Sequence, residues 1–358
     1  SFALELNNNN IYNYSFLIIE SREKYKDDRS WCFWQNNENI NKKLISKSWR
    51  DFSISFQGKK VIHSSSKYQY HYIRSIDFYN YAIRSIKKSP NINLVLGEKA
   101  IKINNLKNKF LVITDKKKYI AKSILDTRPK NNIYINTPFL FQSFLGYEII
   151  ANSNKLKQNR ANIMENMRYE NKKFLFDYIL PITKKTFLVE VTSFSKTKVS
   201  INTLKDLLEK TLISNQFINY KVKRREYGVI PMGFIKKNTY KNSKNYFYAG
   251  SLGGAVRASS GYAFLRIQEW AKESAIYLKK NGKLLSHPKE NIIIHSLDKS
   301  FLRVLEQNIS SAPYIFYVFL NRITTASFIR FMMGKARLID YLKVILAMPK
   351  KYFFSIRF

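Results

Sequence analysis

Cysteine and histidine are scarce in this chain, and their scarcity limits the chemistry that it can perform. Its 358 residues include one cysteine, Cys32, and four histidines. A single cysteine excludes an internal disulfide, which fits a reducing compartment without requiring one. A metal site needs three or four ligands at workable spacing, and the histidines stand without such neighbours, so we expect no bound metal.

Long apolar runs are also missing. No run reaches the roughly 18 residues that a membrane-spanning helix needs, and the first residues show no signal-peptide pattern. The chain begins at Ser1, and residues 1–6 have the pattern of a helix already under way. We therefore expect that the natural N-terminus is missing.

Acidic residues are few. The chain has 25 Asp and Glu residues against 62 Lys and Arg residues, which gives a net charge of +37. Such an excess indicates a polyanionic partner, either nucleic acid or an anionic membrane surface. Because the lysines are scattered and no nucleic-acid recognition motif is visible, we predict no nucleic-acid partner.

Glycine is scarce too, but it is concentrated. Four of the 11 glycines lie within residues 250–261, after an apolar run and before a helical pattern at 262–271. A strand, a glycine turn and a helix place backbone N–H groups and a helix N-terminus against a phosphate. A tight packing turn is the alternative. The predicted nucleotide contacts in this segment are Gly250, Gly253, Gly254, Arg257 and Gly261.

Two further segments fit a nucleotide-binding unit. The apolar run 15–19 predicts a buried parallel strand ending at Glu20, where such units place an acid that binds a ribose hydroxyl. The strand-like residues 119–125 are followed by Asp126 and Arg128, and this pair suits a cofactor crevice. A solvated strand end for Glu20 and a capped turn for Asp126 are the alternatives.

One carboxylate lies inside an otherwise apolar strand. In residues 188–192, alternation places Glu190 on the same face as Leu188 and Thr192. Burial would raise the pKa of Glu190 and make it a usable acid near neutral pH. Glu165 and Glu226 have similar settings, and an exposed acid at a strand edge is the alternative for each of the three.

The C-terminal region has a basic amphipathic pattern. Apolar residues between 328 and 346 recur at helical spacing with basic residues among them, and Lys350, Lys351 and three aromatic residues follow. Such a helix suits the membrane interface, so a membrane surface is a predicted partner. A core helix with one solvated face is the alternative.

The order of these motifs resembles that of the flavoprotein-type lycopene β-cyclases. The matching segments follow the family's order along nearly the whole chain. They are residues 28–34 (DRSWCFW), 141–148 (FQSFLGYE), 163–165 (IME), 176–181 (FDYILP), 188–192 (LVEVT), 226–232 (EYGVIPM), 250–264 and 297–305 (LDKSFLRVL).

The resemblance implies an α/β fold. A Rossmann-like FAD-binding domain would comprise residues 1–45, 73–135 and 240–280, here lacking its first strand and glycine fingerprint. An antiparallel β-sheet substrate domain would comprise residues 46–72 and 136–239, where runs rich in aromatic and β-branched residues also predict strands. Residues 281–358 would form a helical C-terminal region.

The resemblance also implies roles for the acids. The family's catalytic Glu-x-Thr motif falls on Glu190 and Thr192, with Val191 where relatives often have a second polar or acidic residue. The family's Met-Asp motif is Met164 followed by Glu165, whose carboxylate reaches one methylene further. Glu165 or Glu226 would assist Glu190 by positioning it or by accepting a proton.

The implied reaction is the non-redox cyclisation of the linear ends of lycopene to β-rings, which yields β-carotene. A carboxylic acid protonates the polyene, and reduced FAD, maintained by NAD(P)H, stabilises the cation. The lipid-soluble carotenoid implies a peripheral location on the cytoplasmic face of a membrane.

Two alternatives remain open. The first is an FAD-dependent monooxygenase or isoprenoid reductase of the same architecture, although Ser251 stands where hydroxylases typically have an aspartate. The second is a non-enzymatic basic protein that binds lipid.

Overall fold

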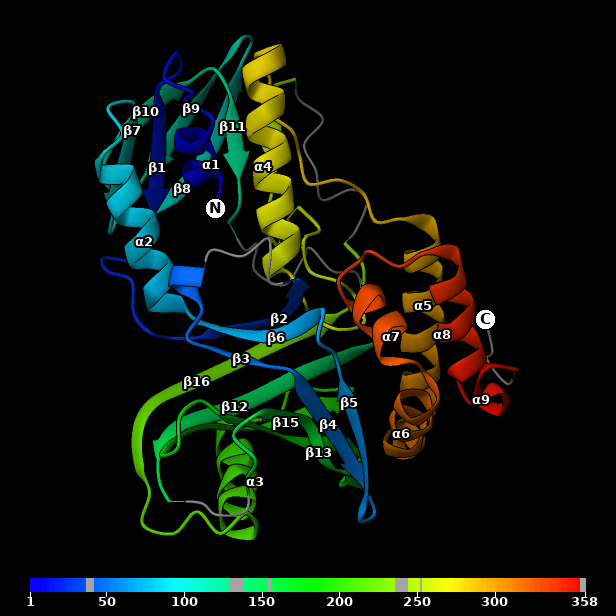
Figure 1. Cartoon of the computed structure of the whole chain (residues 1–358). Coiled ribbons are helices and arrows are strands. Elements are labelled where there is room, and N and C mark those ends of the chain that lie inside the picture. The colour runs from blue at the N-terminus through cyan, green and yellow to red at the C-terminus, as the bar shows by residue number, and fades with distance from the viewer. Residues whose placement is uncertain (37–41, 129–137, 153–155, 236–243, 252, 355–358) are drawn as a thin grey trace. The chain divides into compact units, whose positions relative to one another are not determined.

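The computed structural model describes residues 1–36, 42–128, 138–152, 156–235, 244–251 and 253–354. The chain forms two compact units, each assembled from separate stretches of the sequence (Figure 1). The first comprises Ser1–Asp27, Ser75–Asn136 and Phe234–Ile292, and the second comprises Asp28–Arg74, Thr137–Gly233 and Ile293–Phe358. Sheets and helices occur in both, so the predicted α/β class is confirmed.

The first unit contains the parallel strands. β1 (Phe16–Glu20) is parallel to β7 (Ile92–Leu96), and β11 (Ile124–Asp126) is parallel to β17 (Tyr246–Tyr248). β8 (Ala100–Leu106), β9 (Lys109–Thr114) and β10 (Lys118–Ala121) form an antiparallel meander. The sequence predicted one strand over residues 119–125; the structure divides these residues between β10 and β11, which belong to different sheets.

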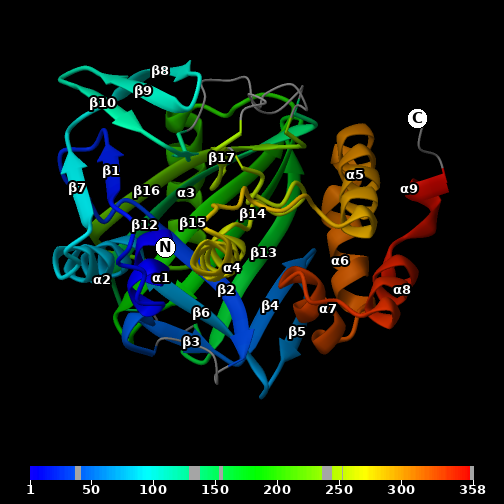
Figure 2. The ribbon, with the colours of Figure 1, turned by 90° about the horizontal axis from the view of Figure 1, so that it is seen from above.

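Helices cover the β1–β7 pair of the first unit. These helices are α1 (Phe2–Asn8), α2 (Ser75–Lys87) and α4 (Phe264–Asn281). Leu6 of α1, Ile92 of β7 and Leu278 of α4 belong to one buried cluster, and Figure 2 shows α1 beside α4. The parallel strands with their covering helices give the Rossmann-like arrangement predicted for this part of the chain.

The second unit contains a seven-stranded sheet in the order β16-β12-β15-β14-β13-β4-β5. Neighbouring strands are antiparallel except for β13 and β4, which are parallel. The strands are β4 (Asp51–Phe56), β5 (Lys59–Ser64), β12 (Leu140–Ile150), β13 (Arg160–Glu170), β14 (Lys173–Pro181), β15 (Thr186–Ser195) and β16 (Lys221–Met232).

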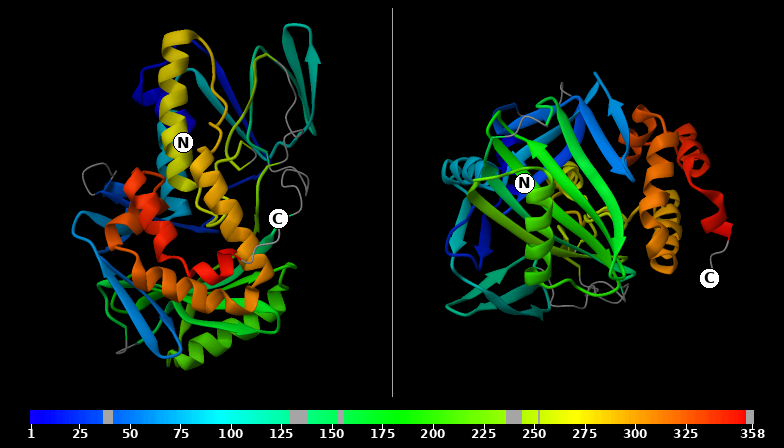
Figure 3. Two further views of the ribbon diagram at one scale, coloured as in Figure 1. Left: turned by 90° about the vertical axis from the view of Figure 1, so that its right-hand side faces the viewer. Right: turned by 90° about the horizontal axis from the view of Figure 1, so that it is seen from below.

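Alternation along these strands separates an apolar face from a polar one. Leu145 of β12 and Val189 and Val191 of β15 are buried in one cluster with α3 (Ile201–Ser214), which lies across the sheet in the right-hand view of Figure 3. Gly146 and Glu190 alternate with these residues and therefore lie on the opposite face.

A smaller sheet and a group of helices complete the second unit. β2 (Ser30–Asn36), β6 (Tyr68–Arg74) and β3 (Lys47–Trp49) form the sheet, and the Trp49 indole donates to the Pro181 carbonyl of β14 over 3.2 Å. The helices gather beside β4 and β13 (Figure 2). They are α5 (Ile292–Gln307), α6 (Ala312–Arg322), α7 (Thr325–Met332), α8 (Leu338–Ala347) and α9 (Lys350–Phe354).

The borders between the units differ from those predicted. Residues 28–45, predicted to belong with the nucleotide-binding domain, lie in the second unit because β2 pairs with β6 along its whole length. Residues 281–292, predicted to belong with the C-terminal helices, lie in the first unit. These residues contact the first unit, for example through a hydrogen bond of 2.9 Å that the His287 backbone N–H donates to the Tyr248 carbonyl.

Candidate active site

Three adjacent strands of the large sheet bring two glutamates together over one glycine. Gly146 of β12 is directly opposite Glu190 of β15 on one side and Glu226 of β16 on the other. A methyl group at Gly146 would lie 3.2 Å from Cβ of Glu190 and 3.2 Å from Cγ of Glu226. Because position 146 has no side chain, both glutamates occupy the space above it.

Glu190 lies where its charged form is disfavoured. Burial and the neighbouring Glu226 raise the pKa of Glu190 to about 8, against the lowering effects of Thr192 and Arg224. The Thr192 hydroxyl donates a hydrogen bond of 2.8 Å to Oε1 of Glu190. Thr192, rather than the residue next to Glu190, supplies this bond because Val191 points to the opposite face and packs in the cluster with α3.

Glu226 is 5% exposed, whereas Glu190 is partly exposed, and Glu226 has a cationic partner. It accepts hydrogen bonds from Nη1 of Arg224 at 2.9 Å and from the Ser30 hydroxyl at 3.0 Å. Burial raises the pKa of Glu226 above its usual value, and Arg224 and Ser30 offset only part of this rise. Of the two carboxyl groups, only Glu226 has an ion pair among the described contacts, and this pair favours its charged form relative to that of Glu190.

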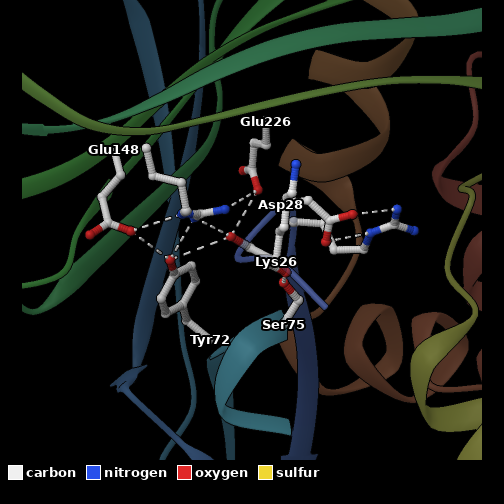
Figure 4. A network of polar contacts seen from close by, with 9 residues as sticks. Lys26, Asp28, Tyr72, Ser75, Glu148 and Glu226 are labelled. Carbon is white, nitrogen blue, oxygen red and sulfur yellow. Dashed lines mark hydrogen bonds and ion pairs between the residues drawn. The ribbon is translucent and has the colours of Figure 1, made fainter. Parts of the chain in front are cut away.

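Arg224 is the centre of a buried polar network (Figure 4). Besides Glu226, its guanidinium contacts Oε2 of Glu148 at 3.3 Å, the Ser30 hydroxyl at 2.7 Å and the Tyr72 hydroxyl at 3.0 Å. Although burial raises the pKa of Glu148, Arg224 and Lys223 hold it below its usual value. The charges of Arg224 and Lys223 thus balance those of Glu148 and Glu226, and an ionised Glu190 would add an uncompensated charge.

Tyr178 and Cys32 lie near Glu190, and Tyr70 is hydrogen-bonded to both of them. Tyr178 of β14 is directly opposite Glu190, and its hydroxyl forms a hydrogen bond with that of Tyr70. The pKa of Cys32 is raised to about 12, chiefly by burial and also by Glu226 and Glu190, against the opposing effect of hydrogen bonds with Tyr178 and Tyr70. The thiol therefore stays protonated at neutral pH.

Glu165 lies in different surroundings. It accepts hydrogen bonds from Ser53 at 2.7 Å and Ser55 at 2.5 Å, both on β4, and forms an ion pair of 3.0 Å with Lys60 of β5. Among the described residues, no hydrogen bond or ion pair joins Glu165 to Glu190 or Glu226. Of the predicted catalytic residues, the structure thus brings together Glu190, Thr192 and Glu226, and it places Glu165 apart.

Glu20, Asp126 and Arg128, which were predicted to contact a nucleotide, lie in the first unit. Glu20, at the end of β1, accepts a hydrogen bond of 3.0 Å from the Arg22 backbone N–H and pairs with the Arg22 guanidinium at 3.3 Å. Asp126 is buried and accepts from Arg128 at 2.8 Å and 2.9 Å and from the Tyr246 hydroxyl at 2.6 Å. The Asp126 carboxylate and the Arg128 guanidinium thus form an ion pair with each other at the ends of β11 and β17.

The glycine segment makes a tight turn between β17 and α4. Gly250 and Gly254 have φ angles of 62° and 92°, which glycine adopts readily. A methyl group at Gly253 would lie 2.5 Å from Cα of Ala249, so the backbone passes too close for any side chain. Gly261 has φ 74° and Arg257 is buried, while Leu252 lies outside the described residues.

The turn leads to a helix N-terminus that fits a phosphate. No side chain caps α4 at Ala263, and its first turn contains no acidic residue. Such an end presents backbone N–H groups and the positive end of the helix dipole to an anion. The residues of this turn and helix therefore fit the phosphates of a nucleotide cofactor.

Comparison with known proteins identifies the family. The model of the lycopene cyclase protein family matches residues 1–357. The chain belongs to this family. Comparison with curated proteins gives no match.

Several solved structures are similar to this lycopene cyclase family member. One is a geranylgeranyl bacteriochlorophyll reductase-like protein from Thermoplasma acidophilum, with TM-score 0.60 and 11% identity. The match covers 98% of this chain and 94% of that one. A p-nitrophenol 4-monooxygenase from Pseudomonas putida has TM-score 0.57 and 11% identity over 97% and 95%. The halogenase PltM in complex with FAD has TM-score 0.55 and 10% identity over 93% and 80%. At these identities the likeness concerns the fold, which is that of FAD-binding flavoproteins.

Several site residues of this family member were missed in the sequence. Arg224, Ser30, Tyr72 and Tyr178 were not among the predicted site residues. Ser30, Gly146 and Tyr178 lie within motifs that resemble the family, at residues 28–34, 141–148 and 176–181, and this was the signal available for them. The contact of Gly146 with the two acids was not predicted. Its role depends on the register of three strands, which the local sequence does not specify.

Proposed function

We propose that this member of the lycopene cyclase family closes β-rings at the ends of lycopene by acid catalysis, with Glu190 as the proton donor. The observation that supports the proposal most is the acid pair over Gly146, in which Glu190 has a raised pKa and Glu226 has a cationic partner. A neutral carboxylic acid beside a carboxylate supplies both a donor and an acceptor for protons.

The reaction is balanced without an external oxidant or reductant. Glu190 gives its proton to the terminal double bond, which leaves a tertiary cation, and the neighbouring double bond attacks this cation to close a six-membered ring. The ring cation then loses a proton to the Glu226 carboxylate, which lies beside Glu190 and can return the proton to it. The substrate and the product have the same formula, so the enzyme would be an isomerase.

The network around Arg224 has a supporting part in this proposal. Arg224 favours the charged form of Glu226, and negative charge on Glu226 and Glu148 would favour the nearby cationic intermediates. Thr192 fixes the orientation of the Glu190 carboxyl group by donating to one of its oxygens. Tyr178 lies directly opposite Glu190 and is hydrogen-bonded to Tyr70, so its ring would line one side of the acid.

The proposed cofactor is reduced FAD, with NAD(P)H as its reductant. Glu20 would bind the ribose, and the turn from Gly250 to Gly261, with the N-terminus of α4, would hold the phosphates. When bound, the reduced flavin would supply negative charge that stabilises the cation, with no net redox change. We also propose that the protein collects this lipid-soluble substrate at the cytoplasmic surface of a membrane.

The test is carotenoid production in a host that accumulates lycopene. Glu190→Gln should abolish β-carotene formation, because the amide keeps the shape of the acid but has no proton to give. Glu209→Gln is a suitable control, since Glu209 is half-exposed on α3 and forms only a long ion pair of 3.9 Å with Lys205. Unchanged cyclisation by Glu190→Gln would refute the assignment.

A second assay separates the cyclase from a redox flavoprotein of the same fold. The purified enzyme should convert lycopene without oxygen and without stoichiometric consumption of reductant. Consumption of one NAD(P)H for each product would instead indicate a reductase, and a strict oxygen requirement would indicate a monooxygenase.

A further inference from the structure

The outer face of α8 is apolar and exposed. Leu338, Ile339, Leu342, Ile345 and Leu346, here called the α8 face, are each 48–74% exposed. The opposite side of the same helix is buried through Asp340, Val344 and Ala347. The alternative prediction for this segment was a core helix with one solvated face. Such a helix would have polar residues at these five positions.

The orientation of α8 is fixed from inside the unit. Nε of Arg330, on α7, donates to Oδ2 of the fully buried Asp340 at 2.8 Å, and Nη2 of Arg330 contacts Oδ1 at 2.5 Å. Asp340 also accepts the Arg337 backbone N–H at 2.9 Å and so caps the first turn of α8. The helix is therefore held with its apolar side directed away from the helices that it packs against, and Figure 1 shows α8 at the outer side of this group.

The surroundings of the α8 face are cationic. The exposed charged residues between positions 335 and 354 are all basic, and the single acid in this range, Asp340, is buried in its pair with Arg330. Tyr352 and the strongly exposed Phe354 of α9 add aromatic rings at one end. The exposed basic residues are Lys335, Arg337, Lys343, Lys350 and Lys351.

We propose that the α8 face docks on a bilayer that contains anionic lipids, with α8 lying in the plane of the interface. Apolar side chains would enter the boundary between headgroups and acyl chains, and the surrounding cations would contact lipid phosphates. At about 1.5 Å per residue, ten residues extend roughly 15 Å, half the thickness of the hydrocarbon core. Among the described helices, none combines the length and the apolar character that spanning a bilayer requires.

A lipid surface suits this face better than a second copy of the chain does. Two copies joined through the α8 face would bring like charges together at its edge, which is unfavourable. An anionic headgroup layer complements the same edge. The proposal concerns where the protein binds and holds whether or not Glu190 is the catalytic acid.

The experiment is flotation of the purified protein with vesicles of phosphatidylcholine, with and without phosphatidylglycerol. The test variant combines Leu338→Ser, Leu342→Ser and Leu346→Ser. The matched control combines Ile213→Ser and Ile218→Ser, because these isoleucines of the same unit are 75% and 73% exposed but lie away from α8. Thermal unfolding of each variant confirms that the unit is folded.

We expect the wild type and the control to bind anionic vesicles, and the triple variant to bind at least roughly tenfold more weakly, because each buried leucine contributes about that factor. The difference should persist in high salt, which screens the general attraction of a basic protein. Equal binding by the triple variant would overturn the proposal, and so would a change from dimer to monomer without loss of vesicle binding. Cyclisation of lycopene in detergent should be retained by the triple variant, which separates a docking defect from a catalytic one.

Discussion

Gly146→Ala is the perturbation that examines the acid pair most selectively. The added methyl group would lie 3.2 Å from Cβ of Glu190, 3.2 Å from Cγ of Glu226 and 3.4 Å from Oε2 of Glu190. Carbon atoms in good contact are about 3.5–4.0 Å apart, so both side chains must move by a few tenths of an ångström. The backbone itself is not strained by the change, because Gly146 is not among the glycines with positive φ.

The size of the effect follows from the cost of an extra methyl group in a packed interior, about 1–3 kcal/mol. If the acid pair absorbs this strain, kcat should fall roughly 5- to 150-fold, since about 1.4 kcal/mol corresponds to a factor of ten. Moving the carboxyl groups apart also weakens the repulsion by which Glu226 raises the pKa of Glu190. The pKa of Glu190 should therefore fall, and the loss of activity on the alkaline side should begin at lower pH.

The assay is the pH dependence of kcat for the purified protein in detergent, together with its thermal unfolding. Gly58→Ala serves as a control, because Gly58 has φ 73° and no neighbouring atom within 4 Å. The control should lose stability through backbone strain alone and keep the wild-type pH profile. A Gly146→Ala enzyme with unchanged kcat and an unchanged profile would refute the role of this glycine.

Two further predictions concern the partners of the acid pair. Arg224→Met should lower the free energy of unfolding by about 3–5 kcal/mol, since it leaves Glu226 and Glu148 buried without their shared cation. Denaturant unfolding measures this free energy. A loss below about 1 kcal/mol would contradict the prediction. Thr192→Val removes a hydrogen bond that lowers the pKa of Glu190. The alkaline limb of the pH–rate profile should therefore move to higher pH, and a movement to lower pH would contradict the assignment.

The alternation of side chains along a strand predicted the relation between site residues that lie on the same strand. Alternation in residues 188–192 placed Glu190 and Thr192 on one face, and the hydrogen bond between them confirms this. The order of weak motifs indicated the family, which the family match confirms. The run at 15–19 predicted a buried parallel strand; β1 is parallel to β7, but none of its residues is fully buried and Leu17 is exposed.

Pairing between distant strands could not be predicted in the same way. Gly146 and Glu226 meet Glu190 only because β12 lies between β15 and β16 in one register, which long-range contacts determine. Arg224 reads as a surface cation until Glu148 and Glu226 are placed beside it. Glu165 was grouped with Glu190 by motif order, yet it bonds to Ser53 and Ser55 of β4, because β13 lies beside that strand.

The central claim is that Glu190 is protonated at neutral pH. Infrared difference spectra between wild type and Glu190→Gln, recorded across a pH titration, report the carbonyl stretch of a protonated carboxyl group at this position. The band should be present at pH 7 and disappear with a midpoint near the pKa of about 8. Its disappearance with a midpoint near the ordinary glutamate value of about 4.3 would mean that Glu190 has no proton to give to the polyene.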